Sequence, residues 1–132
     1  MTSPRRLPSI RIVLALSLAL ASSLSHALTV APYTPAALAA AQRAGAPLVL
    51  HFHASWCPTC RAQDKAFEAL KADPSLKVTL MEVDYDQEKA LEKRMHVTAQ
   101  STLVVFHGAS ERSRSTGETD PAKLKSTLQS AI

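Results

Sequence analysis

The 132-residue sequence contains only two cysteines, three glycines and no internal repeat. Two cysteines close one bridge at most, which excludes a small domain held together by several disulfides. The missing repeat excludes collagen-like, coiled-coil and low-complexity chains. Without a glycine-rich dinucleotide fingerprint, we expect neither NADPH nor a flavin to bind. The composition, with 46% hydrophobic and 20% charged residues, is that of one globular domain.

Acidic residues are absent from the first 27 positions, which hold Arg5, Arg6 and Arg11. These three arginines account for most of the formal net charge of +4, because the rest of the chain carries 12 basic and 11 acidic side chains. A near-neutral domain without a basic stripe offers no electrostatic surface for DNA or RNA. We therefore predict no nucleic-acid partner.

The chain has no apolar run of the about 20 residues that a membrane-spanning helix needs. Instead, the basic start is followed by the apolar residues 12–21 and by Ser25-His26-Ala27, which places small residues where a signal peptidase cuts. We expect residues 1–27 to be a signal peptide and residues 28–132 to form the mature domain. An uncleaved membrane anchor is the alternative. Export predicts an oxidising compartment, most simply a bacterial periplasm.

Beyond residue 27, helix and strand signals alternate along the chain. Thr34-Pro35 and Asp120-Pro121 each combine an N-cap residue with proline at the first helical position. The predicted elements are a helix at 35–44, a strand at 48–53, a helix at 61–71, a strand at 76–83, a short charged helix at 88–95, a strand at 102–106, an exposed edge strand at 111–116 and a last helix from 121 with Leu124, Leu128 and Ile132 on one face. This order predicts an α/β fold whose mixed sheet is covered by helices on both faces.

A Trp-Cys-Pro-Thr-Cys motif at residues 56–60 lies between a predicted buried strand and the following helix. The N–H groups and the dipole of a helix N-terminus stabilise a thiolate, which is the nucleophilic form of cysteine. We expect Cys57 to be the more exposed, attacking thiol, and Cys60 to be the resolving thiol that breaks the mixed disulfide. A structural bridge, or a copper or zinc site that recruits His51 and His53, is the alternative. Because there is no second cysteine pair, we predict no metal, and no cofactor other than the Cys57–Cys60 disulfide.

Three segments of the sequence are each similar to a segment of one protein family. Residues 52–60 are similar to its active-site strand and turn, residues 83–86 to the end of its next strand, and residues 101–108 to its cis-proline segment. Over residues 35–132, the sequence resembles the thioredoxin family. The resemblance implies a thioredoxin-like three-layer α/β/α fold with a central mixed sheet, and a protein-disulfide oxidoreductase that uses the two cysteines. The motif is also similar to that of exported thioredoxin-like reductases of cytochrome c maturation, whose usual central insertion is absent here.

Two positions differ from the family's buried acid–base pair. Thioredoxins place an Asp six residues before the first cysteine and its Lys partner 25 residues after it, and here these positions are His51 and Glu82. We expect His51 to accept the proton of Cys60, and Glu82 to pair with the imidazole and orient it. An inert core histidine and a solvent-facing glutamate are the alternatives. Strand alternation puts His53 on the same face as His51, where we expect it to pack.

The family's cis-proline is replaced by Ser101. We expect the peptide bond before Ser101 to be trans, since a cis bond to a non-proline residue costs about 2.5–4 kcal/mol. The serine hydroxyl would then lie near the thiols and donate a hydrogen bond to a thiolate. The resemblance assigns client binding to this loop and to the residues around the cysteines, which gives the substrate-binding set Trp56, Pro58, Thr59, Gln100, Ser101 and Thr102.

The Pro58-Thr59 dipeptide carries no charge that would stabilise the reduced thiolate and make the disulfide oxidising. We therefore expect an exported, monomeric reductase that acts on protein disulfide clients and that a membrane electron donor keeps reduced. A net oxidant or an isomerase is the alternative direction. Two further hypotheses are a redox-inactive, chaperone-like thioredoxin fold and a metal-binding module that uses Cys57, Cys60 and His51.

Overall fold

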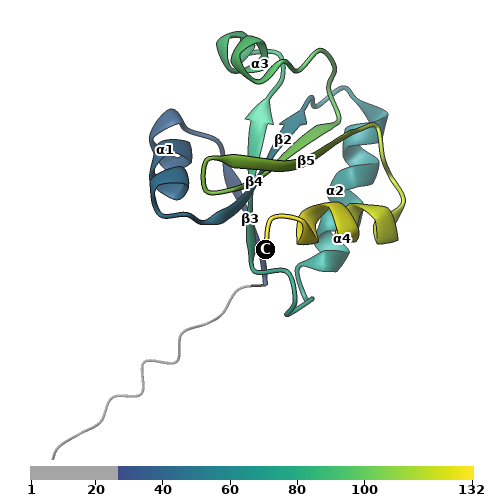
Figure 1. The fold of residues 1–132 in the computed structure, drawn as a ribbon. Coiled ribbons are helices and arrows are strands. Elements are labelled where there is room, and N and C mark those ends of the chain that lie inside the picture. The colour runs from purple at the N-terminus through teal and green to yellow at the C-terminus, as the bar shows by residue number, and fades with distance from the viewer. Residues whose placement is uncertain (1–26) are drawn as a thin grey trace, which may run out of the picture.

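The computed structural model describes residues 27–132 (Figure 1). The predicted signal peptide lies outside the described residues except for Ala27. Within residues 27–132, no helix is both long enough and apolar enough to cross a membrane.

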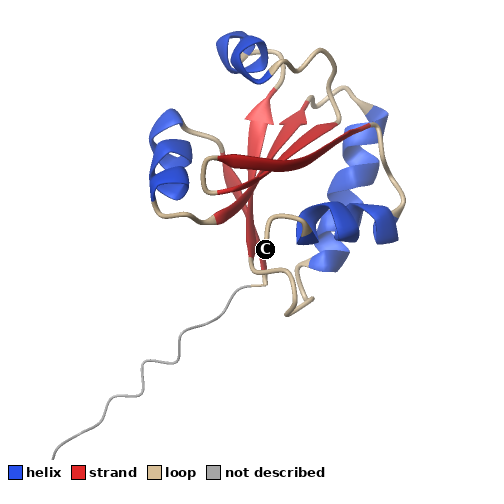
Figure 2. Ribbon diagram, in the orientation of Figure 1, coloured by secondary structure: helices blue, strands red, loops and turns tan. Residues whose placement is uncertain are grey.

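The strands form one sheet in the order β1-β3-β2-β4-β5, in which β1, β3 and β2 are parallel and β4 and β5 are antiparallel to their neighbours. In chain order the elements are β1 (Leu28–Pro32), α1 (Pro35–Arg43), β2 (Pro47–His53), α2 (Pro58–Leu70), β3 (Val78–Asp84), α3 (Lys89–Met95), β4 (Thr102–His107), β5 (Ser110–Thr116) and α4 (Pro121–Gln129). Helices α2 and α4 lie together on one side of the sheet, and α1 lies on the other (Figure 2). This three-layer arrangement around a mixed sheet confirms the predicted α/β class.

The N-termini of α1 and α4 form as the sequence predicts. The Thr34 hydroxyl accepts the N–H of Ala37 at 3.0 Å, and the Asp120 carboxylate accepts the N–H of Lys123 at 2.9 Å. A proline follows each cap and lacks the N–H that the first turn would leave unpaired. These caps fix where each helix begins.

Strand β1 is a part of the sheet that the sequence analysis did not predict. It pairs with β3 in parallel, starting with Leu28 opposite Val78. Leu28 is its one fully buried residue, so the segment shows no alternation of apolar and polar positions. The strand is therefore defined by its backbone pairing with β3 at the edge of the sheet and not by a pattern of side chains.

Two helix ends also differ from the prediction. Helix α2 begins at Pro58 instead of Arg61, because Cys57 itself serves as the N-cap. Helix α4 ends before the C-terminus, so Ile132 is 58% exposed and Ala131 takes the buried place that was expected for it.

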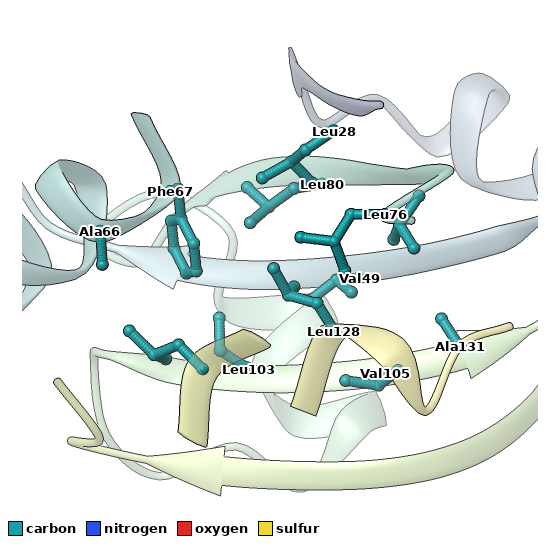
Figure 3. Packing of buried hydrophobic residues seen from close by; sticks show 12 residues of the cluster. Leu28, Val49, Ala66, Phe67, Leu76, Leu80, Leu103, Val105, Leu128 and Ala131 are labelled. Carbon is teal, nitrogen blue, oxygen red and sulfur yellow. The ribbon is translucent and has the colours of Figure 1, made fainter. Parts of the chain in front are cut away.

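Two apolar clusters fill the space between the layers, and their burial supplies the main stabilisation of the fold. The cluster between the sheet and helices α2 and α4 (Figure 3) contains Leu28, Val49, Ala66, Phe67, Leu76, Val78, Leu80, Leu103, Val105, Leu124, Leu128 and Ala131. The cluster between the sheet and helices α1 and α3 contains Leu38, Leu48, Leu50, Phe52, Met81, Val83, Leu91, Val97, Val104 and Phe106.

The two rows of side chains on β2 meet different surroundings. The row from Leu48 to Phe52 belongs to the apolar cluster beneath α1 and α3. The alternate row starts with Val49 in the other cluster and continues with His51 and His53 towards the start of α2. The α2 side of the sheet therefore changes from apolar to polar within one strand, next to the cysteine motif.

Candidate active site at the start of α2

The two cysteines lie on the first turn of α2. Cys57 has an extended backbone (φ −85°, ψ 114°) and caps the helix, with Pro58 at the first helical position. Its Sγ accepts the backbone N–H of Cys60 at 3.1 Å, and both residues are free thiols. The sulfur occupies the place of a capping oxygen, where the helix N-terminus favours a negative charge.

Ser101 lies against both sulfurs. Its hydroxyl is 3.1 Å from the Sγ of Cys57 and 3.3 Å from the Sγ of Cys60. The residue has a left-handed backbone (φ +60°), and every peptide bond within residues 27–132 is trans. Its N–H donates to the carbonyl of Phe52 at 2.8 Å, which anchors the loop to the end of β2. The expected trans bond and the expected contact with the thiols are both confirmed.

Exposure does not separate the attacking thiol from the resolving thiol. Cys57 is 1% exposed and Cys60 is 0% exposed, so the expected difference in exposure is negligible and both thiols are buried. The reason is local packing: Ala54 and Tyr85 surround the pair, and the Ser101 hydroxyl contacts both sulfurs.

Hydrogen bonding does separate the two thiols. Burial opposes ionisation of Cys57, but donors from the Cys60 thiol, the Ser101 hydroxyl and the backbone N–H groups of Cys60 and Thr59 outweigh burial and lower its pKa. Burial and the adjacent Cys57 raise the pKa of Cys60, although Ser101 acts in the opposite direction. Cys57 is therefore the thiol that ionises first, which is the property an attacking cysteine requires.

Gln63 links the Ser101 loop to His51, and the sequence analysis missed it. Its buried amide group donates to the carbonyl oxygens of Ser101 at 3.1 Å and Glu118 at 2.9 Å. Its own carbonyl oxygen lies 2.9 Å from Nε2 of His51. A signal was present, because Gln63 follows Cys60 by one turn on the stripe of α2 that faces the sheet.

His51 and Glu82 do not form the expected pair. They are neighbours in the β2–β3 register, yet the Glu82 carboxylate lies 3.9 Å from Nδ1 of His53 and its side chain is 47% exposed. A carboxylate beside the fully buried His51 would lose its hydration, so the Glu82 side chain extends towards solvent instead. His51 also does not contact Cys60 in the described hydrogen bonds; it contacts Gln63 instead.

The two histidines differ in environment although they share one face of β2. Burial lowers the pKa of His51 to about 4, against the opposite effects of Gln63 and Asp64. His53 is partly exposed, and its Nε2 lies 2.9 Å from the carboxylate of Asp64. His53 was expected only to pack against its neighbours, but its side chain also makes this polar contact.

Comparison with known proteins assigns this chain to a family. The family model described as Thioredoxin matches residues 32–130, which include both cysteines, Gln63 and Ser101. The chain belongs to the thioredoxin family. Its Cys57–Cys60 pair is the CxxC motif of this thioredoxin domain.

Individual relatives agree with this family assignment. A thioredoxin H-type of Chlamydomonas reinhardtii is 35% identical over 60 residues, which are 46% of this chain and 53% of that protein. Protein disulfide-isomerase erp38 of Neurospora crassa is 36% identical over 73 residues, 53% of this chain and 20% of that protein. The chain thus spans from 20% to 53% of the length of these curated relatives. The crystal structure of Trxlp from Edwardsiella tarda EIB202 is 37% identical, with a TM-score of 0.72, and covers 76% of this chain and 98% of that chain.

Of the substrate-binding set, Trp56 and Pro58 are the members that this thioredoxin domain exposes beside the thiols. Trp56 is 55% exposed, and its indole N–H donates to the Asp86 carboxylate at 2.8 Å. Thr59 and Gln100 are half-buried.

Thr102 and the backbone of Ser101 face inwards instead. The Thr102 hydroxyl donates to the carbonyl of Ala99 at 2.8 Å, and the residue is 3% exposed, so its side chain does not reach the surface around the thiols. The Ser101 carbonyl accepts the N–H of Gly117 at 3.0 Å in addition to the Gln63 amide. The loop therefore offers a client neither the Thr102 side chain nor the Ser101 carbonyl in this conformation.

Proposed function

We propose that this member of the thioredoxin family is an exported protein-disulfide oxidoreductase that works mainly as a reductase. The observation that carries the proposal is the pair of thiols at the start of α2, in which hydrogen bonds lower the pKa of Cys57 while burial raises that of Cys60. Family membership and the relatives named above, one of them a protein disulfide-isomerase, support this chemistry.

The reaction begins when the Cys57 thiolate attacks one sulfur of a client disulfide. A Cys57–client bond forms, the client S–S bond breaks, and the second client sulfur leaves as a thiolate. Cys60 then loses its proton and attacks the Cys57 sulfur, which releases the remaining client thiol and closes the Cys57–Cys60 disulfide. The client gains two electrons and the protein loses two, so a membrane electron donor must supply two electrons for the next turnover.

The Ser101 hydroxyl is placed to serve both half-reactions. At 3.1 Å from Cys57 it donates to the thiolate before attack, and at 3.3 Å from Cys60 it lies next to the thiol that must ionise afterwards. The rigid backbone of Ser101, held by Phe52 and Gln63, keeps the hydroxyl in this position.

Insulin reduction tests the activity and the division of labour between the two thiols. Cys57→Ser should abolish reduction and trap no client, because the nucleophile is gone. Cys60→Ser should accumulate mixed disulfides through Cys57, visible by mass spectrometry. Ser55→Ala, an exposed residue next to the motif, serves as the control and should keep the parent rate. If both cysteine variants retain insulin-reducing activity, the enzymatic proposal is wrong.

The direction of electron flow is tested by the reduction potential of the Cys57–Cys60 pair, measured against glutathione. The uncharged Pro58-Thr59 dipeptide supports a reducing pair, with a potential close to that of thioredoxin, about −270 mV. A value near that of a strong oxidant, about −120 mV, would reverse the proposed direction.

Export to the periplasm rests on the first 27 residues, with Arg5 and Arg6 before the apolar residues 12–21. Intact-mass analysis of the exported protein should give a chain that begins at Leu28. A mass that retains residues 1–27 would instead mean a membrane-tethered protein. Size-exclusion chromatography of the same material should show a monomer.

A further inference from the structure

A second cluster of chemically active side chains lies outside the cysteine motif. His53, Asp64 and Glu82 come from β2, α2 and β3. One nitrogen or oxygen atom from each lies within 4.8 Å of the others. His53 Nε2 is 2.9 Å from Asp64 Oδ2, and His53 Nδ1 is 3.9 Å from Glu82 Oε1. Three separate elements therefore bring one imidazole and two carboxylates to a single point.

His51 provides an independent observation at the same point. It is fully buried, and its Nδ1 has no hydrogen-bond partner among residues 27–132. Gln63 donates its amide hydrogens to two backbone carbonyls, so its oxygen accepts from Nε2–H of His51. Neutral His51 therefore presents the lone pair of Nδ1, which lies 3.9 Å from Asp64 Oδ1. Two hydrogen-bond acceptors face each other across this gap, and a cation between them would satisfy both.

The charges around the cluster favour such a cation. Within the described residues, the basic side chains within 4.0 Å of the Asp64 and Glu82 carboxylates are those of the two histidines, and no lysine or arginine is among them. Lys71 lines the adjoining cleft but is paired with Glu68 at 2.6 Å. Two carboxylates without a lysine or arginine partner supply the two negative charges that would neutralise a divalent ion.

The cluster is also open to solvent. The Asp64 side chain is 42% exposed and that of Glu82 is 47% exposed, whereas His53 is 15% exposed. A cleft of about 190 Å³ borders both carboxylates. An ion can therefore enter from the carboxylate side and meet the imidazoles at the inner end.

We propose that this cluster binds one divalent transition-metal ion of the zinc class, through the imidazoles of His51 and His53 and the carboxylates of Asp64 and Glu82. Zinc lies about 2.0–2.2 Å from nitrogen and oxygen ligands and is almost always tetrahedral, so two ligands of one ion lie roughly 3.4 Å apart. The two separations of 3.9 Å therefore have to shorten and the His53–Asp64 contact of 2.9 Å has to widen, each by about half an ångström. Imidazole ligands favour zinc, copper or nickel over magnesium or calcium.

The site contains no thiolate, which distinguishes it from a metal module built on Cys57 and Cys60. The experiment therefore uses the protein with the Cys57–Cys60 disulfide closed, after removal of adventitious metal with a chelator. Isothermal titration with Zn²⁺ should show saturable binding of one equivalent. Substitution of Co²⁺ should give visible absorption bands without a sulfur-to-cobalt charge-transfer band.

Two variants decide whether the named residues hold the ion. His53→Ala combined with Glu82→Gln should weaken Zn²⁺ binding at least tenfold. The matched control, His96→Ala combined with Glu88→Gln, changes a histidine and a glutamate that flank the two ends of α3, and should bind as the parent does.

Glu82→Gln alone is a second test, because a half-exposed carboxylate can be neutralised without risk to folding. It should also weaken binding. The proposal is overturned if the oxidised protein shows no saturable binding, or if the His53/Glu82 variant binds Zn²⁺ as tightly as the control. Neither result would bear on insulin reduction, so this inference and the proposed function fail independently.

Discussion

The two faces of the sheet meet their helices in different ways. Towards α1 and α3, strand β2 presents the apolar, fully buried side chains of Leu48, Leu50 and Phe52. Towards α2 and α4, the same strand presents Val49 and then His51, whose burial is equally complete. On the α1 face, β2 contributes apolar side chains only, whereas on the α2 face its apolar side chain is followed by polar groups next to the thiols.

The difference shows what the polar half of the α2 face contributes. Buried polar groups destabilise a fold unless each is hydrogen-bonded. Gln63 meets this condition with three contacts, and through them it holds the backbone of Ser101 beneath the sulfurs. Changes on the α1 face should therefore lower stability alone, and changes on the polar half should also alter the thiols. Four predictions test this division.

The largest effect is expected on the apolar face. Leu50→Ala removes a fully buried side chain and should lower the free energy of unfolding by about 2–5 kcal/mol, measured by urea denaturation. The pKa of Cys57 should stay unchanged in the folded variant. Ile132→Ala, at a position that is 58% exposed, is the control and should change stability by less than about 0.5 kcal/mol. A shift in the Cys57 pKa in the Leu50 variant would contradict the proposed division.

Ser101→Pro should destabilise the protein by about 3 kcal/mol or more. Proline requires a φ near −65°, whereas Ser101 has +60°, and proline lacks the N–H that donates to Phe52 at 2.8 Å. Ser101→Gly is the control, because glycine adopts a positive φ freely and keeps the N–H. Thermal melts of the two variants decide the matter: a proline variant as stable as the parent would mean that the loop does not hold this conformation.

Gln63→Leu should cost about 1–3 kcal/mol, since it leaves the Glu118 carbonyl oxygen and the buried His51 N–H without partners and removes one of the two donors to the Ser101 carbonyl. Gln129→Leu makes the same change on the exposed face of α4 and should be nearly neutral. Chemical denaturation compares the two. Equal stability of both variants would show that the Gln63 contacts contribute nothing.

The smallest effect concerns the hydroxyl of Ser101. Ser101→Ala removes one donor to the Cys57 thiolate and should raise the Cys57 pKa, towards that of an ordinary thiol. Since the donors lower this pKa, the parent forms its thiolate at a lower pH than the variant does. The midpoint of the pH profile for iodoacetamide alkylation measures the shift, and Ser55→Ala should keep the parent midpoint. An unchanged midpoint in Ser101→Ala would mean that the hydroxyl does not act on the thiolate.

Local signals in the sequence predicted most of the fold. The caps at Thr34 and Asp120 placed the starts of α1 and α4, apolar runs placed β2, β3 and β4, and a polar segment after a turn placed the edge strand β5. Strand β1 was missed because only Leu28 of its residues is buried, and pairing at a sheet edge leaves no pattern in the side chains. Its partner β3 was predicted from its own apolar residues, so the error was confined to the sheet edge.

The candidate site could be predicted only where a residue's role follows from its position relative to the motif. The CxxC spacing and the place of Ser101 gave the two sulfurs and the hydroxyl between them. The partner of Glu82 could not be predicted, because exposure rather than strand register decides where a long carboxylate side chain lies. The place of Gln63 on the inward stripe of α2 could have indicated a buried side chain, but its three hydrogen-bond partners could not be predicted, because they come from distant segments of the chain.

The near-complete burial of Cys57 has a kinetic consequence. Because only 1% of Cys57 is exposed, the structure around the sulfur has to open before the thiol can react. The observed rate of the thiol's reaction is then its intrinsic rate multiplied by the small fraction of open molecules. A small oxidant has little surface with which to stabilise the open state. Under the proposed function, a protein client that docks on the neighbouring Trp56, which is 55% exposed, would favour opening. Such a dithiol would react slowly with small molecules in its surroundings and faster with proteins that first dock beside it.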